Sequence, residues 1–440
     1  MPPICGDGAP SLRAGVNLRR RSRTVTGLGD LALSVLTVTV SYVQRAFKFR
    51  LYPTSKQHDA LGLMCAAHAE LYNAGLQERR DAWRMRRTSV SASSQMLQLK
   101  EIRTVRPDQG VWSFTSQQQT LRRLDKAFGA FFRRVKASQT PGYPRFRAAA
   151  RFDSVDFRHG DGIKFHQDKK QLYVMGVGHV QIRLHRALPE GAALGQVSVK
   201  REGSGRRTRW FVVIPVEVQP APLPMTGAIT GIDMGVASFL TTSEGVHVPN
   251  PRHLKVAAAR LAAAQQDLAR KKRGSNRRRK TVSRVAALHG TVRRQRLDYA
   301  HKTALRLVQH HDLICHEALQ IPNMTKRAKP VPDPARPGAF LPNGQAAKTG
   351  LNKSILDAGW GVFLSVLPAK AENAGRDVIS VNPANTSRTC PNCGHCAKGN
   401  RPSQAVFTCQ QCGFTGHADT VGAINILRAG TALRQTAHAA

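Results

Sequence analysis

Four cysteines near the end of the chain are spaced as the ligands of one tetrahedral metal ion. Cys390 and Cys393 form one Cys-x-x-Cys pair, and Cys409 and Cys412 form a second pair after fifteen intervening residues. Each pair can turn two thiolates toward one Zn²⁺, and the intervening segment is long enough for a short β-hairpin. Disulfides explain the pattern less well, because Cys-x-x-Cys pairs at this separation are typical of metal sites in reducing compartments. The cysteines therefore predict a structural zinc ribbon.

Three carboxylates stand at the ends of predicted regular elements, where their side chains can converge. Asp233 lies in an apolar strand that opens a β-meander at residue 228, Glu317 ends the apolar strand from residue 312, and Asp419 begins a helix just after the zinc ribbon. Two-metal hydrolysis of phosphodiesters needs such a cluster, because carboxylates hold the Mg²⁺ ions that activate water and stabilise the leaving oxygen. Each residue alone is equally well explained as a turn or cap acid. Their joint placement around the ribbon favours a catalytic magnesium site.

The charge of the chain indicates its partner. Among its 440 residues, 67 are Lys or Arg and 27 are Asp or Glu, which gives a formal net charge of +40 at pH 7. Such an excess repels itself unless a polyanion neutralises it, and nucleic acid is the usual polyanion. The hydrophobic content of 41% is sufficient for globular cores, which excludes a disordered basic tail. The composition therefore predicts a nucleic-acid-binding protein of several domains.

The strongest local charge lies in residues 251–300, which hold 15 Lys and Arg but only two acidic residues. The alanine and leucine content predicts two long helices joined at Gly274-Ser275. A solvated basic surface is the alternative, but the charge excess favours a surface that faces nucleic acid. The predicted nucleic-acid contacts gather at the joint: Lys271, Lys272, Arg273, Arg277, Arg278, Arg279 and Lys280.

The N-terminal part of the chain predicts no membrane span. The apolar run at residues 31–43 is shorter than the roughly 20 residues that a bilayer requires. A basic cluster precedes this run, so a signal peptide is the alternative, but no small-x-small cleavage site follows it. We expect residues 1–43 to be a poorly ordered extension of a cytoplasmic protein.

The remaining segments predict two further folding regions and one loop. Residues 45–52 alternate as a half-buried strand, and amphipathic helices follow from about residues 55 and 116. Residues 150–220 have the pattern of short strands, which the first strand would complete into a small β-barrel. The segment 325–346 carries five prolines and predicts a mobile loop.

Taken together, these motifs resemble the TnpB family, also called OrfB, of transposon-encoded RNA-guided nucleases related to the type V CRISPR effectors. The resemblance spans nearly all of residues 45–428. It is carried by Arg45–Pro53, Ala127–Phe146, Gly231–Gly235, Glu317 with Asn323-Met324, Asp357–Trp360, Asn382–Cys393 and Ser403–Ile426.

The resemblance implies an α/β multidomain protein. Residues 227–428 would form a RuvC-like nuclease with the ribonuclease H fold, into which a zinc ribbon is inserted at residues 386–416. Residues 44–54 and 146–226 would form a β-barrel wedge domain, and residues 55–145 a helical recognition lobe. Residues 429–440 would be a tail.

The resemblance also implies an activity, because the family's three catalytic acids match Asp233, Glu317 and Asp419. They would hold catalytic Mg²⁺, while the cysteines hold structural Zn²⁺. The expected partners are a guide RNA and double-stranded target DNA, with neither a membrane nor a small-molecule cofactor. The expected function is RNA-guided, Mg-dependent DNA cleavage for a transposable element, in the cytoplasm of a prokaryotic cell and near its nucleoid.

The alternative function is a non-cleaving guided DNA-binding repressor or a transposition accessory protein. The retained acids favour the nuclease, because a protein that only binds DNA has no need for three carboxylates amid so much phosphate. The chain departs from the family pattern at Val421, where an Asn is usual, and at Ala369, where a Tyr is frequent. Neither difference removes a metal ligand.

Overall fold

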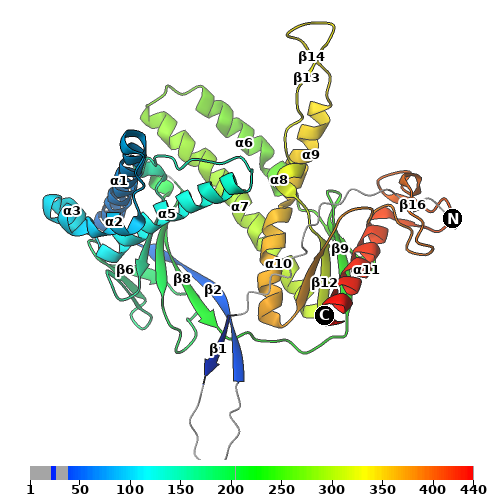
Figure 1. Ribbon diagram of the computed structural model, residues 1–440, viewed down its shortest axis with the longest axis horizontal. Coiled ribbons are helices and arrows are strands. Elements are labelled where there is room, and N and C mark those ends of the chain that lie inside the picture. Colours follow the sequence, from blue (N-terminus) through cyan, green and yellow to red (C-terminus); the bar gives the residue numbers. More distant parts are fainter. Residues whose placement is uncertain (1–20, 26–37, 204, 440) are drawn as a thin grey trace, which may run out of the picture. The chain divides into compact units, whose positions relative to one another are not determined.

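The computed structural model describes residues 21–25, 38–203 and 205–439, and Figure 1 shows its helices and strands. The chain divides into two compact units, each with its own sheet and helices. The N-terminal unit comprises residues 44–218 and 274–286. The C-terminal unit comprises residues 219–273 and 287–439, together with the described residues before Gln44.

The predicted extension over residues 1–43 lies mostly outside the described residues. The parts that are described are β1 (Arg21–Val25) and the first residues of β2 (Val38–Tyr52), which pair in antiparallel register. β2 therefore begins before the strand predicted at residues 45–52, because the polar–apolar alternation marks only its second half.

The sheet of the N-terminal unit has the strand order β3-β7-β8-β2-β6-β5-β4. β2 thus lies inside the sheet, between β8 and β6, so the first strand joins the later short strands as predicted. Closure into a barrel stays a prediction. The later strands are β3 (Ser154–Arg158), β4 (Ile163–His166), β5 (Gln171–Val174), β6 (Gly178–Arg183), β7 (Gln196–Glu202) and β8 (Arg209–Val218).

Two long helices dominate the rest of this unit. α1 starts at a capping box, in which the Thr54 hydroxyl accepts from the Gln57 backbone and the Gln57 side chain accepts from the Thr54 backbone. α1 packs on α5 through buried residues that include His68, which bonds the Ser116 hydroxyl at 2.8 Å. The helices are α1 (Ser55–Arg86), α2 (Ala92–Leu97), α3 (Leu99–Val105), α4 (Pro107–Gly110) and α5 (Phe114–Lys136).

The C-terminal unit is built on a five-stranded sheet with the order β11-β10-β9-β12-β15. β9, β10 and β11 form the antiparallel meander that the sequence predicts, and β12 and β15 extend it as parallel strands. The strands are β9 (Ile229–Met234), β10 (Ser238–Thr242), β11 (His247–Pro249), β12 (Leu313–Glu317) and β15 (Asp377–Val381).

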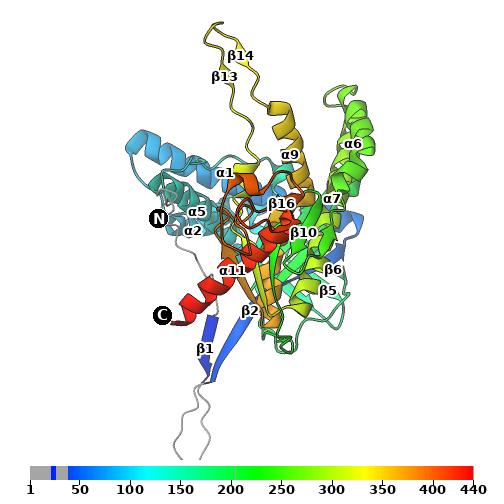
Figure 2. The ribbon, with the colours of Figure 1, turned by 90° about the vertical axis from the view of Figure 1, so that its right-hand side faces the viewer.

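Helices cover both faces of this sheet. The predicted helix pair joined at Gly274-Ser275 is present as α6 and α7. Figure 2 shows α11 lying across the side of the sheet that faces the viewer. The helices that follow β11 along the chain are α6 (His253–Ala269), α7 (Asn276–His310), α8 (Ile321–Met324), α9 (Gln345–Ala358), α10 (Trp360–Ala374) and α11 (Ala418–Ala439).

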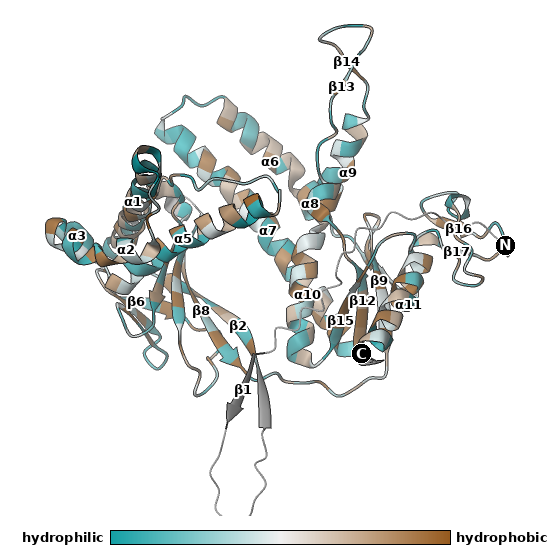
Figure 3. Ribbon diagram, viewed as in Figure 1, coloured by the Kyte–Doolittle hydropathy of each residue, from teal (hydrophilic) through white to brown (hydrophobic). Residues whose placement is uncertain are grey.

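Each face of the sheet has its own hydrophobic core. On one face, Ile232 and Ile314 pack with residues of α7, α9 and α10, including the fully buried Phe363. On the other face, Leu313 and Cys315 pack with α11. Successive strand residues point to opposite faces, so β12 serves both cores. The apolar, buried start of β12, Leu313–Cys315, is typical of a central parallel strand, and β12 is largely brown in Figure 3.

The proline-rich segment 325–346 contains a short hairpin, β13 (Val331–Pro332) with β14 (Phe340–Leu341). Figures 1 and 2 both show it projecting away from the sheet of its own unit. A second small hairpin, β16 (Val406–Thr408) with β17 (Thr415–His417), lies directly before α11. Within the described residues, no helix is both long enough and apolar enough to cross a membrane.

Candidate active site and metal centre

Asp233 and Glu317 lie at the same level of neighbouring parallel strands. The β9–β12 register pairs Ile232 with His316, so the next residue of each strand is one of the two acids. Glu317 is also the last residue of β12. The two predicted carboxylates are therefore brought together at one point of the sheet.

Asp419 reaches the same region from α11, which packs closely over β9. A Cβ atom built on Gly231 would lie 2.1 Å from the Ala423 carbonyl oxygen, so only glycine allows this approach of helix to strand. A Cβ atom on Gly422 would lie 3.1 Å from the Asp233 carboxylate. The small residues of α11 and β9 thus leave room for Asp233 beside the turn that carries Asp419.

The charges of the three acids act on one another. Burial and, after it, the nearby charges of Glu317 and Asp419 together raise the pKa of Asp233 to about 8. Burial also raises the pKa of Glu317. Carboxylates that lie this close together repel one another when they are all ionised. A divalent cation would compensate their negative charge, so the group favours cation binding.

Arg401 is a site residue that the sequence did not reveal. Its guanidinium donates to the Asp419 carboxylate at 3.1 Å and to the Gln404 carbonyl at 2.8 Å. Its charge also opposes the rise in the pKa of Asp233. Arg401 lies between the two cysteine pairs, in a segment whose spacing carries no signal for an active-site contact.

Thr386 and Asn425 hold Glu317 and were not predicted as site residues either. The Thr386 hydroxyl donates to the Glu317 carboxylate at 2.6 Å and lowers the pKa that burial raises. The Asn425 side chain on α11 donates to the carbonyls of Thr386 and Thr389, at 2.8 Å and 2.7 Å. The helix that carries Asp419 thus also fixes the segment that positions Glu317.

The Asp357–Trp360 motif supports the turn after Asp233 from the opposite face. The Trp360 indole N–H donates to the Gly235 carbonyl at 3.2 Å. The Asp357 carboxylate accepts from the backbone N–H groups of Leu254 and Lys255 at the start of α6, and from Arg296 at 2.7 Å. The motif therefore has a structural role next to the acids.

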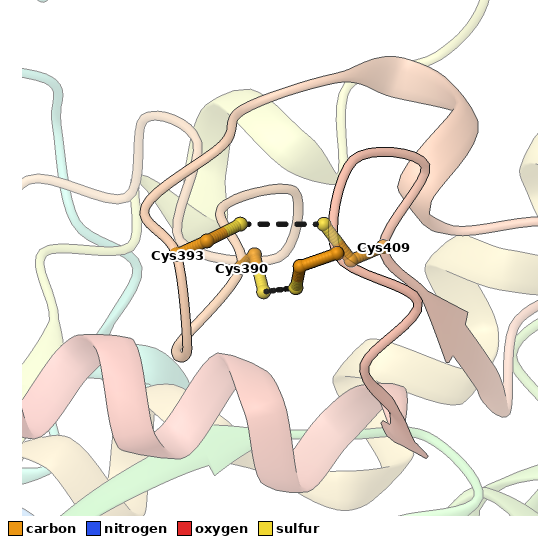
Figure 4. Close-up of side chains that lie close together, drawn as sticks. Cys390, Cys393 and Cys409 are labelled. Atoms are coloured by element: carbon orange, nitrogen blue, oxygen red, sulfur yellow. Dashed lines mark hydrogen bonds between the residues drawn. The ribbon is translucent and has the colours of Figure 1, made fainter.

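The structure brings the four cysteines together as a metal site would require. Their sulfur atoms all lie within 4.8 Å of one another, and Figure 4 shows the sulfurs of the two pairs facing each other. The Cys390–Cys412 and Cys393–Cys409 sulfur distances are both 3.6 Å. A tetrahedral Zn–S bond of about 2.3 Å requires sulfur atoms about 3.8 Å apart. The donor set and its geometry therefore fit Zn²⁺.

Val421, one of the two departures from the family pattern, joins the cysteine-bearing segment to α11. It is buried in one small cluster with Cys390, Cys409, Phe407 and Ala418. A valine suits this apolar position, because burying the polar amide of an asparagine there without a hydrogen bond would cost free energy. The substitution lies in packing and leaves the three carboxylates in place.

The predicted nucleic-acid contacts all lie where α6 and α7 are joined. Most of them are exposed, and Lys271 pairs with Asp267 one helical turn earlier. Between Ala269 and Asn276 the chain has no helix, so the basic side chains project from a turn and from the first turn of α7.

Three family models match the chain. A helix-turn-helix domain of the OrfB family matches residues 41–88, a probable transposase of the same family matches residues 213–328, and a Cas12f1-like TNB domain matches residues 360–426. The last match contains the four cysteines together with Arg401 and Asp419.

Two curated bacterial proteins are similar over most of their length. One, from Escherichia coli K12, is named "Putative RNA-guided DNA endonuclease InsQ" and is 31% identical over 88% of this chain and 93% of its own. The other, from Streptomyces pristinaespiralis, is named "Putative RNA-guided DNA endonuclease" and is 33% identical over 89% of this chain and 90% of its own.

A solved structure shares the fold. A chain in the cryo-EM structure of a Cas12f1-sgRNA-target DNA complex matches with a TM-score of 0.53 and 14% identity, over 88% of this chain and 98% of the other. At that identity the likeness concerns the fold alone. The long matches to the two bacterial relatives show that this chain belongs to the TnpB family of transposon-encoded proteins, also called OrfB.

Proposed function

We propose that this protein is an RNA-guided DNA endonuclease whose catalytic Mg²⁺ is held by Asp233, Glu317 and Asp419. The observation that carries the proposal is the convergence of these carboxylates from β9, β12 and α11. Burial and the charges of Glu317 and Asp419 raise the pKa of Asp233 there to about 8. The names of the two long relatives support the guided activity. The domain limits that the sequence predicts, with a RuvC-like nuclease at residues 227–428, belong to this proposal.

The bound ions would supply the positive charge that activates a water molecule and stabilises the leaving oxygen of the cut strand. The chain supplies the ligands and their positions. Asp233 is in the partly buried strand β9, Glu317 is oriented by the Thr386 hydroxyl, and Asp419 lies in the first turn of α11. Oxygen ligands of this kind suit a hard cation such as Mg²⁺.

Arg401 would act on the phosphate. Its guanidinium donates to the Asp419 carboxylate, so it would be within reach of a phosphodiester held beside these carboxylates by Mg²⁺. Guanidinium groups pair strongly with phosphate oxygens. We propose that Arg401 moves its contact from Asp419 to the phosphate when Mg²⁺ and DNA bind together.

Charged and aromatic surfaces support guide RNA and target DNA as the partners. The α6–α7 joint presents the basic residues described above. In the N-terminal unit, the end of α5 and the following turn expose Phe132, Tyr143 and Phe146 near Arg133 and Arg134. Aromatic rings stack on bases while arginines neutralise phosphates, a combination typical of proteins that bind nucleic-acid strands.

The affinity for Mg²⁺ is expected to rise with pH. Metal binding needs the ionised Asp233 carboxylate, whose pKa of about 8 lies above its ordinary value of 3.8, so below pH 8 a proton must leave. The half-saturating Mg²⁺ concentration for cleavage should fall by up to about tenfold per pH unit from pH 6 to pH 8 and then level off. Magnesium titrations at constant ionic strength measure this, and equal values at pH 6 and pH 8 would contradict it.

Removal of the Thr386 hydroxyl is expected to weaken metal binding. In a Thr386→Val protein, Glu317 loses its orienting hydrogen bond, and the half-saturating Mg²⁺ concentration should rise roughly tenfold or more, as for other residues that orient metal ligands. Thr389→Val is the matched control, because the Thr389 hydroxyl bonds the Asn385 carbonyl instead of a carboxylate. Equal Mg²⁺ curves for the two variants would contradict the role of Thr386.

The proposed function is tested by purifying the protein from cells, sequencing the RNA bound to it, and offering DNA that matches that RNA. We expect one recurrent RNA species and Mg²⁺-dependent cutting of the matched DNA alone. Absence of bound RNA would overturn the guided activity. Bound RNA with guided DNA binding but no cutting would instead support the repressor.

A further inference from the structure

Two histidines lie beside the proposed catalytic acids without belonging to them. The rings of His247, on β11, and His417, the last residue of β17, meet edge to face with 4.5 Å between their centroids. Both side chains are exposed. No spacing in the sequence relates His247 to His417, so the pair is visible only in the structure.

His247 is connected to Asp233 through the neighbouring strand β10. Across β9, β10 and β11, the register places Asp233 opposite Thr241 and Thr241 opposite His247. Residues paired in this way project from the same face of a sheet. The buried Thr241 hydroxyl lies 3.1 Å from Nδ1 of His247 and thereby fixes the orientation of the ring.

His417 contacts the backbone of Asp419. The backbone N–H of Asp419 donates to Nδ1 of His417 at 3.3 Å, so His417 caps the first turn of α11. The same turn also approaches the β10–β11 loop, where a Cβ on Gly245 would lie 4.0 Å from the Thr420 methyl group. The His247 ring is therefore the lateral support of the residue that caps the Asp419 helix.

We propose that His247 is a positioning residue for Asp419 and acts through its ring contact with His417. The contacts run from Thr241, opposite Asp233, through His247 and His417 to the backbone of Asp419. They tie the two acids together by a route that does not use the cysteines. Loss of the His247 ring leaves the His417 cap without support, so Asp419 holds its metal in a less defined geometry.

The test is the Mg²⁺ dependence of cleavage by the RNA-bound protein carrying single substitutions at His247. His247→Ala should raise the half-saturating Mg²⁺ concentration about tenfold, the lower end of the effect of residues that orient metal ligands. His247→Phe keeps the ring and should stay within about threefold of wild type, whereas His247→Asn keeps a polar group without the ring and should resemble His247→Ala. The exposed His310, at the far end of α7, provides the control His310→Ala, which should match wild type.

A wild-type Mg²⁺ curve for His247→Ala would overturn the inference, as would a His247→Phe curve that resembles His247→Ala. Because the inference rests on the proposed function, Asp419→Ala is measured in the same series. Cleavage by Asp419→Ala would overturn the proposed function. An inactive Asp419→Ala beside an unaltered His247→Ala would overturn the positioning role alone. Zinc content and melting temperature should not change in any His247 variant, since the side chain is exposed.

Discussion

An Asp233→Asn protein is expected to bind its RNA and matched DNA but to cut that DNA at least about 10³-fold more slowly than wild type. The substitution keeps the shape of the side chain and removes the ionised oxygen ligand. Metal ions contribute several kcal/mol of charge stabilisation to the transition state, and each 1.36 kcal/mol corresponds to a factor of ten in rate. Single-turnover cleavage with saturating Mg²⁺ measures the effect.

The same variant should be more heat-stable than wild type when Mg²⁺ is absent. At pH 7 the folded protein must keep Asp233 protonated, because burial and the charges of Glu317 and Asp419 raise its pKa, whereas the unfolded chain ionises it freely. Asparagine removes this free-energy cost of folding. Asp298→Asn is the control, because Asp298 is exposed and only pairs with Lys302 on the surface of α7. Wild-type cleavage by Asp233→Asn would exclude Asp233 from the catalytic site. An equal loss in Asp298→Asn would show that the loss is not specific to Asp233 and would contradict the prediction.

Replacing Cys390 with serine is expected to remove the zinc and to slow cleavage roughly 100-fold, at the upper end of the effects of outer-shell residues on activity. Three contacts connect the cysteine-bearing segment to the catalytic acids, so loss of the zinc would disturb the positions of the acids. Asn425 bonds the carbonyl of Thr389, directly before Cys390, Val421 packs against Cys390 itself, and Arg401 reaches Asp419 from between the cysteine pairs. A structural zinc site is largely unfolded without its metal, so these contacts depend on the ion.

Cys396→Ser is the matched control, because Cys396 is exposed and is not part of the four-cysteine group. It should keep one zinc per protein by elemental analysis and cleave at the wild-type rate. Wild-type cleavage by a zinc-free Cys390→Ser protein would show that the ribbon does not position the acids. Loss of RNA binding alone would place the role of the ribbon elsewhere.

The sequence predicts those parts of the site that depend on local spacing. The cysteine pairs bring their own turns, with Gly394 and Gly413 at positive φ of 76° and 71°. Asp233 and Glu317 lie at or next to the ends of apolar strands, and such strands can be recognised from composition. The helix pair α6–α7 follows from its alanine, leucine and basic residues.

The parts that depend on tertiary register could not be predicted. Arg401 meets Asp419 because the ribbon folds back on α11, and Thr386 meets Glu317 because β15 lies beside β12. His247 meets His417 only once the meander and α11 are packed together. In each case the partners are separated by at least 18 residues or come from different elements, so no spacing rule relates them.

The measurement that tests the central proposal most directly changes the RNA and leaves the protein as it is. The protein is assembled with its own RNA, or with the same RNA in which only the segment that pairs with DNA has been replaced, and both are offered two plasmids in Mg²⁺. The proposal predicts that the replaced segment redirects cutting entirely to the second plasmid, and that Asp233→Asn cuts neither. Cutting of the same plasmid with both RNAs, or cutting by Asp233→Asn, would contradict it.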